Sequence, residues 1–504
     1  MHPALLIDEI LRQIFHFCSD YDQRSLISAA RTCKAWKDPA LDLIWNRLFC
    51  LGPLLLLLPG SIISNNEYIY KEHSSANDLR VFNAYACRVK HISNKQRLRI
   101  NPSTTAQLPF SYSNGPYLPN LTTAHISIPR TNFLLMPFNL SPHLIHLDID
   151  LGFQKREVDV GTMLCEYLER VHSQCSGLRH LSVRGLANKR LNQIISTMRN
   201  LESLSLRLGH SLLSETLLAV KTFPYLSELE IHAGHIEPDD SNEPCQYEDC
   251  RTFPLLRKLH IRAQSSLIET MMQHIQGNTV CHLHLELDDP TSSDSSWNSI
   301  FNMICLKASN TIQHLALEHH YEIAESPMPI PSGATQNVQG TDPGATSMHF
   351  ETLQILCKLQ ALRHFSLDLT LPTIMSDDDI HKVISWWPDL EHFELGLVPQ
   401  TSEVEADTID KQMTTASLVL FALKCPELKR LIIPLTIDNL PVPYPLPQII
   451  LPSQLRNLTI AKINTPNPID LGQYLRRLFS QLDCVEGPCD DVQPWIDINH
   501  ALHM

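Results

Sequence analysis

The sequence predicts an α/β protein in which a short helical module precedes a long, irregular solenoid of strand–helix repeats. Twelve fragments of the form Leu-x-x-Leu-x-Leu, with Ile, Val, Ala or Phe at some positions, recur between residues 121 and 460. Helical patterns separate many of them, and the first fifty residues follow a helical pattern of their own. A short strand with alternating apolar side chains needs neighbours to bury that face, so the fragments predict a stacked array.

The first fifty residues predict three small helices. Leu6, Ile10 and Ile14 recur at helical spacing and indicate a helix over about residues 5–17. A second apolar face begins at Leu26, and we expect Pro39 to end that helix because proline lacks a backbone amide. A third helix follows, and its apolar face consists of Leu41, Ile44, Trp45 and Leu48.

The order of these residues is similar to the F-box family over about residues 3–49. The matching segments are Leu6-Ile7-Asp8-Glu9-Ile10-Leu11, Ile14-Phe15, Leu26, Cys33-Lys34-Ala35-Trp36 and Trp45. The family usually has proline where this chain has Ile7. The resemblance implies that the module binds a Skp-type adaptor of a cullin RING ubiquitin ligase. The candidate adaptor-binding residues are Leu6, Ile7, Ile10, Phe15, Cys33, Trp36 and Trp45, each of which either contacts the adaptor or holds the helices together.

The rest of the chain resembles leucine-rich-repeat proteins. The fragments begin at Leu121, Leu144, Leu178, Leu201, Leu226, Leu256, Val280, Ile312, Leu362, Leu390, Leu428 and Leu455. Successive starts lie 23 to 50 residues apart, against about 20–29 in regular arrays. The Asn or Cys that the family places three residues after the last apolar position is missing. We therefore expect an irregular solenoid with a parallel sheet on one side and helices on the other.

These patterns predict four segments. Residues 1–50 form the F-box-like module, and residues 51–115 form a linking segment with a helix near 79–89, as in fungal F-box proteins. Residues 116–465 form the solenoid. Residues 466–504 form a C-terminal cap, because the last strand of a solenoid needs cover.

The strand positions that point away from the core are candidates for binding a target protein. The residue just before the second apolar position is histidine in six of eleven fragments. One interpretation is a titratable column that gains charge as the pH falls through about 6.5. The other is a tolerated strand residue half-covered by its neighbours, since Glu228 and Lys258 interrupt the column. The candidate target-binding residues are His146, His180, Arg184, Arg207, His282, His284, His314, His364 and His392.

Composition and motifs limit the other classes of function. A net charge of −14 argues against a nucleic-acid-binding surface. The Leu54–Leu58 run is much too short to span a membrane, and we expect neither a membrane segment nor a secretory signal. The 14 cysteines contain no Cys-x-x-Cys pair, and His282 and His284 lack an identifiable third ligand, so we expect no metal and no cofactor. Phosphate-loop, zinc-protease and nucleophile-elbow motifs are missing from the sequence, so we expect no catalytic activity.

Together these features predict a cytoplasmic or nuclear substrate receptor of a Skp-cullin-F-box ubiquitin ligase. The first fifty residues dock to the adaptor, and the repeats present an unidentified target protein. The alternative is a protein-binding scaffold outside any ligase, in which the first helices only cap the end of the solenoid.

Overall fold

The computed structural model describes most of the chain. The described residues are 6–21, 23–58, 60–64, 67–70, 79–93, 99–100, 116–127, 136, 138–153, 160–237, 252–289, 294–319, 348–369, 373–397, 413–437, 453–465, 467–488 and 492–504. The chain divides into two compact units, Met1–Leu226 and Ser227–Met504. Each unit is described by itself.

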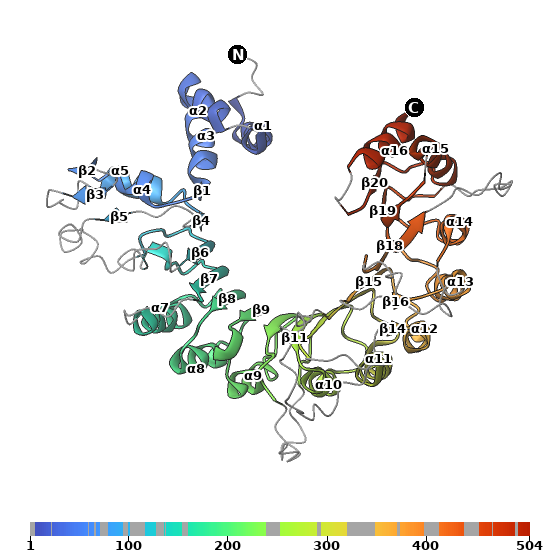
Figure 1. Cartoon of the computed structure of the whole chain (residues 1–504). Helices are drawn as coiled ribbons and strands as arrows, with labels where there is room; N and C mark the ends of the chain where they lie inside the picture. Colours follow the sequence, from blue (N-terminus) through green and yellow to red (C-terminus); the bar gives the residue numbers. More distant parts are fainter. Residues whose placement is uncertain are drawn as a thin grey trace, which may run out of the picture. The chain divides into compact units, whose positions relative to one another are not determined.

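The first unit begins with three helices, α1 (Asp8–Tyr21), α2 (Gln23–Thr32) and α3 (Lys34–Asn46) (Figure 1). Their shared core is small. It consists of Leu11 and Phe15 from α1, Leu26 from α2 and Ala40 from α3. The three predicted helices are confirmed, although their boundaries differ from those expected.

The prediction that Pro39 ends the second helix is wrong. The break comes at Cys33, whose backbone is extended with φ −157° and ψ 168°, and Pro39 lies inside α3. A proline inside a helix removes one main-chain hydrogen bond and crowds the preceding turn. Pro39 and the adjacent Ala40 are both buried, so packing of this helix face against α1 and α2 offsets that loss.

Short elements follow the three helices in the first unit. They are β1 (Arg47–Leu48), α4 (Gly52–Leu55), β2 (Ser61–Ser64), β3 (Glu67–Tyr70), α5 (Arg80–Ala86), β4 (His91–Ser93) and β5 (Arg99–Ile100). Helix α5 confirms the helix expected near residues 79–89. The Tyr68 side chain is fully buried, and its hydroxyl donates a hydrogen bond to the Leu55 carbonyl at 2.8 Å. This bond joins β3 to α4.

The repeats of the first unit form parallel strands with helices along one side (Figure 1). The strands β6 (Thr123–Ser127), β7 (His146–Gly152), β8 (His180–Gly185) and β9 (Ser203–Arg207) continue from β1 and β4. The helices are α7 (Val160–Gln174), α8 (Lys189–Thr197) and α9 (Ser214–Val220). Leu147, Leu181 and Leu204 are paired in register on the covered face, and each is nearly inaccessible to water.

The second unit repeats the arrangement. Its main sheet has the order β10 (Glu228–His232), β11 (Lys258–Ala263), β12 (His282–Leu287), β13 (His314–His319), β15 (His364–Leu369), β17 (His392–Leu395), β18 (Arg430–Ile437), β19 (Asn457–Ile463) and β20 (Cys484–Glu486). The helices are α10 (Ser265–His274), α11 (Asp294–Ala308), α12 (Phe350–Leu353), α13 (Asp377–Trp386), α14 (Thr415–Lys424), α15 (Pro468–Leu478) and α16 (Gln493–His503). A two-stranded ladder joins β14 (Met348–His349) to β16 (Thr373–Ile374). All twelve predicted fragments coincide with strands.

Main-chain hydrogen bonds join each repeat to the next at the point where the strand begins. Two successive amides of one strand donate to a single carbonyl of the strand before it, at 2.7–3.3 Å. Thr122, for example, donates its amide to the Lys90 carbonyl, and its own carbonyl accepts the amides of Ile145 and His146 on the next strand. We call this series of hydrogen bonds the carbonyl ladder. The accepting residues are Lys90, Thr122, Ile145 and Arg179 in the first unit and Ser227, Arg257, Cys281, Gln313, Arg363, Glu391, Lys429 and Arg456 in the second.

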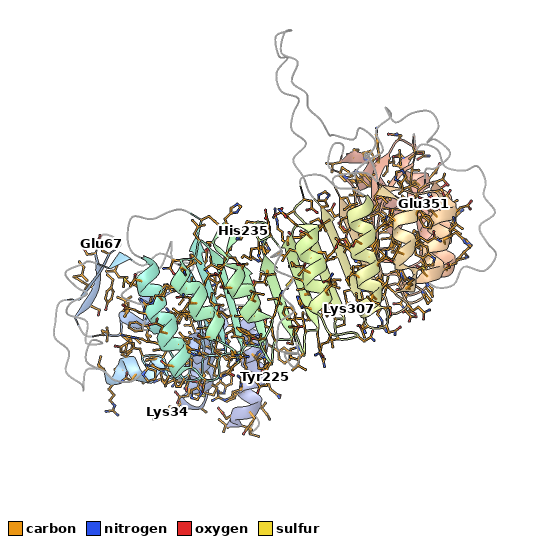
Figure 2. All side chains as sticks on the ribbon, turned by 90° about the horizontal axis from the view of Figure 1, so that it is seen from below. Lys34, Glu67, Tyr225, His235, Lys307 and Glu351 are labelled. Atoms are coloured by element: carbon orange, nitrogen blue, oxygen red, sulfur yellow. The ribbon has the colours of Figure 1, made fainter. Side chains whose placement is uncertain are left out.

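Side chains cap some of the helix ends. Ser376 and Asp379 form a reciprocal capping box at the start of α13. At the end of α10, the Lys307 ammonium of α11 donates to the carbonyls of Gln273 and Ile275 at 2.7 and 3.2 Å, and Figure 2 labels Lys307 near the end of its helix. A cation at this position also interacts favourably with the helix dipole.

The chain ends with a packed helical pair. Helices α15 and α16 and the short strand β20 lie in the segment that the sequence predicts as a C-terminal cap. Asn499 of α16 bonds both the amide and the carbonyl of Val485 in β20, each at 2.8 Å. Among the described residues, no helix is long and apolar enough to cross a membrane.

Candidate functional site

Helix α1 carries two apolar stripes on different faces. Leu11 and Phe15 point into the three-helix core and are 1% and 3% exposed. Ile7, just before the helix, and Ile10, Ile14 and Phe17 within it form a second series at spacings of three and four residues, and their exposures are 46%, 36%, 40% and 71%. We call this second series the outer stripe of α1. Such a spacing places its members on one helix face.

The seven predicted adaptor-binding residues separate into two groups by exposure. Leu6, Ile7 and Ile10 are exposed, so their side chains are available to a partner. Phe15 is buried and meets the Trp36 ring edge-on, with ring centroids 5.5 Å apart. The Trp45 ring packs on the Tyr85 ring of α5, with ring centroids 4.8 Å apart. Cys33 is the residue just before α3. Phe15 and Trp36 therefore contribute to the packing of the module.

Ion pairs fix the orientation of α1 on α3 and of α3 on α5. The Arg12 guanidinium contacts Asp8 at 2.6 Å and Asp42 at 2.8 Å. Asp42 also pairs with Arg88, which contacts Asp38 at 2.6 Å. These pairs lie at the surface, where each adds at most about 1 kcal/mol of stability. Their effect is to keep α1 in one orientation, with the outer stripe directed away from the core.

The strand residues that alternate with the buried ones form the uncovered side of each sheet, which we call the open face. In the second unit, the histidines of four neighbouring strands stack there as a column. The ring centroids of His282 and His314 are 4.0 Å apart, those of His314 and His364 are 4.0 Å apart, and those of His364 and His392 are 5.9 Å apart. The register pairs the same residues directly.

Burial lowers the pKa of three histidines in the column. Burial, together with the neighbouring imidazoles His282, His364 and His392, lowers the pKa of His314 to about 4, although Glu391 acts in the opposite direction. Burial also lowers the pKa of His282 and of His364. His282, His314 and His364 therefore gain charge at a lower pH than the 6.5 expected from sequence.

The column ends where the sequence predicts its interruption. Lys258 on β11 pairs with Glu228 on β10 at 2.7 Å.

In the first unit, His146 and His180 stack with ring centroids 4.0 Å apart. Arg184 lies over the Phe153 ring at 5.5 Å, and its register partner on the next strand is Arg207.

A second row on the open face of the second unit contains histidines paired with carboxylates. His260 Nε2 lies 2.5 Å from a Glu286 carboxylate oxygen, and His260 Nδ1 lies 3.4 Å from Glu230. His284 contacts Glu318 at 2.7 Å and stacks on His260 at 4.0 Å. Burial acts to lower the pKa of His260, but hydrogen bonds to Glu230 and Glu286 outweigh it and raise the pKa to about 9.

Two groups of side chains among the described residues have the geometry to hold a metal ion. One consists of Glu230, His232 and His260, and the other of His260, His284 and Glu286. His282, which the sequence pairs with His284, belongs to neither group. Sequence reasoning missed His232 and Glu286 because they come together only through the register of three strands.

Comparison with known proteins supports the prediction that the helical module is similar to an F-box. Residues 8–51 match the family model described as F-box-like. No curated protein matches the sequence. Two solved structures are similar to this chain over much of its length. An internalin from Listeria monocytogenes has 10% identity over 69% of this chain and 86% of its own, with a TM-score of 0.29. The Toll–Spatzle complex of Drosophila has 11% identity over 84% of this chain and 57% of its own, with a TM-score of 0.31.

The fold and the family match together define the class of protein. It has an F-box-like domain at residues 8–51, followed by an irregular solenoid of parallel strands and helices that is similar to leucine-rich repeats. The family match supports the expected F-box, and the solenoid assignment rests on the strand order and register of the chain itself. Both kinds of domain are typical of non-catalytic, protein-binding proteins.

Proposed function

We propose that this protein is the substrate receptor of a Skp-cullin-F-box type ubiquitin ligase. In this proposal, residues 1–50 dock to the Skp-type adaptor, residues 51–115 link the module to the repeats, residues 116–465 present a target protein, and residues 466–504 cap the solenoid. Such a role belongs to the cytoplasm or the nucleus.

The outer stripe of α1 is the observation that supports this proposal most strongly. A small module with its own core does not need a second apolar stripe for stability, and keeping Phe17 at 71% exposure in water is unfavourable. An exposed apolar helix face of this kind is typical of a protein-binding site. It lies within the segment that matches the F-box-like model.

The departure at Ile7 leaves the start of α1 intact. The Ile7 carbonyl accepts a hydrogen bond from the Leu11 amide at 3.0 Å, as the residue that begins a helix does. The proline usual at this position would also tolerate this conformation, because the first amides of a helix have no partner within the helix. Ile7 instead adds a flexible apolar side chain to the outer stripe.

The open face supports the target-binding half of the proposal. It presents histidines, arginines and carboxylates on rigid neighbouring strands, and mixed polar surfaces of this kind suit a protein ligand. The proposed mechanism is proximity. A target held on the repeats meets the ubiquitin carrier bound to the rest of the ligase at a high effective concentration.

Co-purification with a Skp-type adaptor tests the proposal. We would compare the full-length protein with the double variant Ile10→Asp/Phe17→Asp, which places two charges on the outer stripe without entering the core. The matched control is Leu306→Asp, because Leu306 is a 75% exposed apolar residue on helix α11. We expect the wild type and the control to bind the adaptor, and the double variant to lose binding while its circular dichroism stays unchanged.

Trp36→Ala is a less informative variant for this test. Trp36 packs on Phe15 and on the three-helix core, so its loss would disturb the module whether or not it contacts the adaptor. Failure of the wild type to bind the adaptor would overturn the receptor proposal and leave the alternative, a scaffold that binds proteins through its repeats outside any ligase.

A further inference from the structure

We propose that Glu230, His232 and His260 form a binding site for Zn²⁺ on the open face of the second unit. Glu230 and His232 are two residues apart on β10, so their side chains leave the same face of the strand. His260 on β11 is the register partner of Glu230. The three ligand atoms lie within 4.8 Å of one another.

One ligand-to-ligand distance matches tetrahedral coordination, and a second is longer. Zinc bonds to histidine nitrogen and carboxylate oxygen are about 2.0–2.2 Å long, and a tetrahedral angle then separates two ligand atoms by about 3.4 Å. His260 Nδ1 is 3.4 Å from the Glu230 carboxylate oxygen. His232 Nε2 is 4.0 Å from the same oxygen, so a small rotation of the His232 side chain completes the set.

The two imidazoles are inclined rather than parallel. The rings of His232 and His260 meet at 62°, with centroids 5.9 Å apart, so their in-plane lone pairs are able to converge on one ion once Zn²⁺ displaces the proton on His260 Nδ1. A site of two histidines and one carboxylate is a set that zinc prefers, and it leaves the fourth position open. The side chains are 21–26% exposed, so this open position is available to water or to a ligand atom of a second molecule.

Glu286 supplies the outer support that metal-binding histidines usually have. Its carboxylate oxygen lies 2.5 Å from His260 Nε2, which orients the ring and directs Nδ1 toward Glu230. A histidine that binds a metal commonly donates its other N–H to a carboxylate in this way. Glu286 is in turn 4.0 Å from the guanidinium of Arg262. The two carboxylates beside His260 also favour a cation at this place.

The second group, His260, His284 and Glu286, is the less favourable alternative. The rings of His260 and His284 are stacked with an angle of 8° between them, so their lone pairs run side by side and do not converge. His260 Nε2 and the Glu286 carboxylate oxygen are 2.5 Å apart, less than the about 3.4 Å that separates two ligand atoms of one tetrahedral zinc ion. The two groups also share His260, and occupation of both would require a bridging imidazole.

The experiment is a Zn²⁺ titration of the full-length protein, purified without a polyhistidine tag and treated with a chelator. Affinity is measured by competition with a chromophoric chelator, and stoichiometry by elemental analysis. We expect one equivalent to bind with a dissociation constant in the micromolar range or below. His232→Ala should weaken this binding at least about tenfold, and Glu286→Gln about 10- to 100-fold.

Two control variants distinguish this site from other histidines. His314→Ala removes an imidazole of the stacked column, and His284→Ala removes a ligand of the alternative group only, so both should bind Zn²⁺ much as the wild type does. Absence of a micromolar site in the wild type overturns the proposal. So does loss of binding in His284→Ala with binding retained in His232→Ala. Equal weakening by His314→Ala and His232→Ala would mean adventitious binding to surface histidines and also overturns it. Circular dichroism confirms that each variant is folded.

Discussion

Replacing Asn192 should destabilise the first unit locally. Asn192 is 1% exposed, and its side-chain carbonyl accepts hydrogen bonds from the Leu213 amide at 3.1 Å and the Thr216 hydroxyl at 3.0 Å. Its amide donates to the Ser211 carbonyl at 2.9 Å. Leucine has a similar size but leaves these groups without that partner, and each unsatisfied buried group costs about 1–3 kcal/mol. We expect Asn192→Leu to cost about 3 kcal/mol.

Hydrogen exchange at the Leu213 amide measures this effect directly. A single free energy of unfolding is poorly defined for a chain with two compact units, whereas exchange reports the local opening. A loss of about 3 kcal/mol corresponds to exchange roughly 100-fold faster. The matched control is Asn302→Leu, because Asn302 is exposed on α11 and makes one side-chain bond within its own helix.

A double-mutant cycle checks the assigned cause. Thr216→Val removes the hydroxyl that donates to Asn192, and residues that share a hydrogen bond should show a coupling of about 1 kcal/mol. If the Leu213 amide exchanges as slowly in Asn192→Leu as in the wild type, the reasoning is refuted. Additive effects of the two substitutions would show that the bond between them contributes nothing.

Three further results are expected. Phe17→Ala should weaken adaptor binding by about 1–2 kcal/mol, or roughly 5- to 30-fold by calorimetry, because 71% of this side chain is free to be buried by a partner; unchanged affinity would exclude Phe17 from the interface. Asp377→Ala should lower the free energy of local opening at the start of α14 by about 1–3 kcal/mol, because this carboxylate accepts hydrogen bonds from the amide and hydroxyl of Thr414 at 3.0 and 2.6 Å; unchanged hydrogen exchange at the Thr414 amide would contradict this. Acidification from pH 6.5 toward pH 4 should destabilise the second unit, because the unfolded chain takes up a proton at about 6.5 whereas the pKa of His314 is lowered to about 4. Solvent screening reduces the effect of this one group to the order of 1 kcal/mol, and His314→Gln should flatten the pH dependence of the urea midpoint.

The strands of the solenoid could be predicted from sequence because each contains at least two buried residues in alternation. Leu147 and Ile149 in β7 are an example. Strands β1, β4 and β20 were missed because each has a single buried residue, Leu48, Ile92 and Val485 respectively. One apolar residue does not define a period, and these strands form because a neighbouring edge is available to pair with.

The candidate sites were only partly predictable. Leu11 and Phe15 have the same four-residue spacing as Ile10 and Ile14, so the pattern alone does not identify which stripe α2 and α3 cover. The alternation of strand residues correctly places His282, His314, His364 and His392 in one row. The neighbours of His260, by contrast, come from strands that are separated by long stretches of sequence, and only their register brings Glu230 and Glu286 to its two nitrogens.

The carbonyl ladder has a consequence for how this solenoid can change over evolutionary time. Its bonds involve only main-chain atoms, so the residues that make them are as different as Thr122, Arg179, Cys281 and Glu391. Alignment between repeats therefore imposes almost no demand on side-chain identity at that edge. The neighbouring positions of the open face are free to mutate toward a new partner, while main-chain hydrogen bonds keep the strands of the ladder in register.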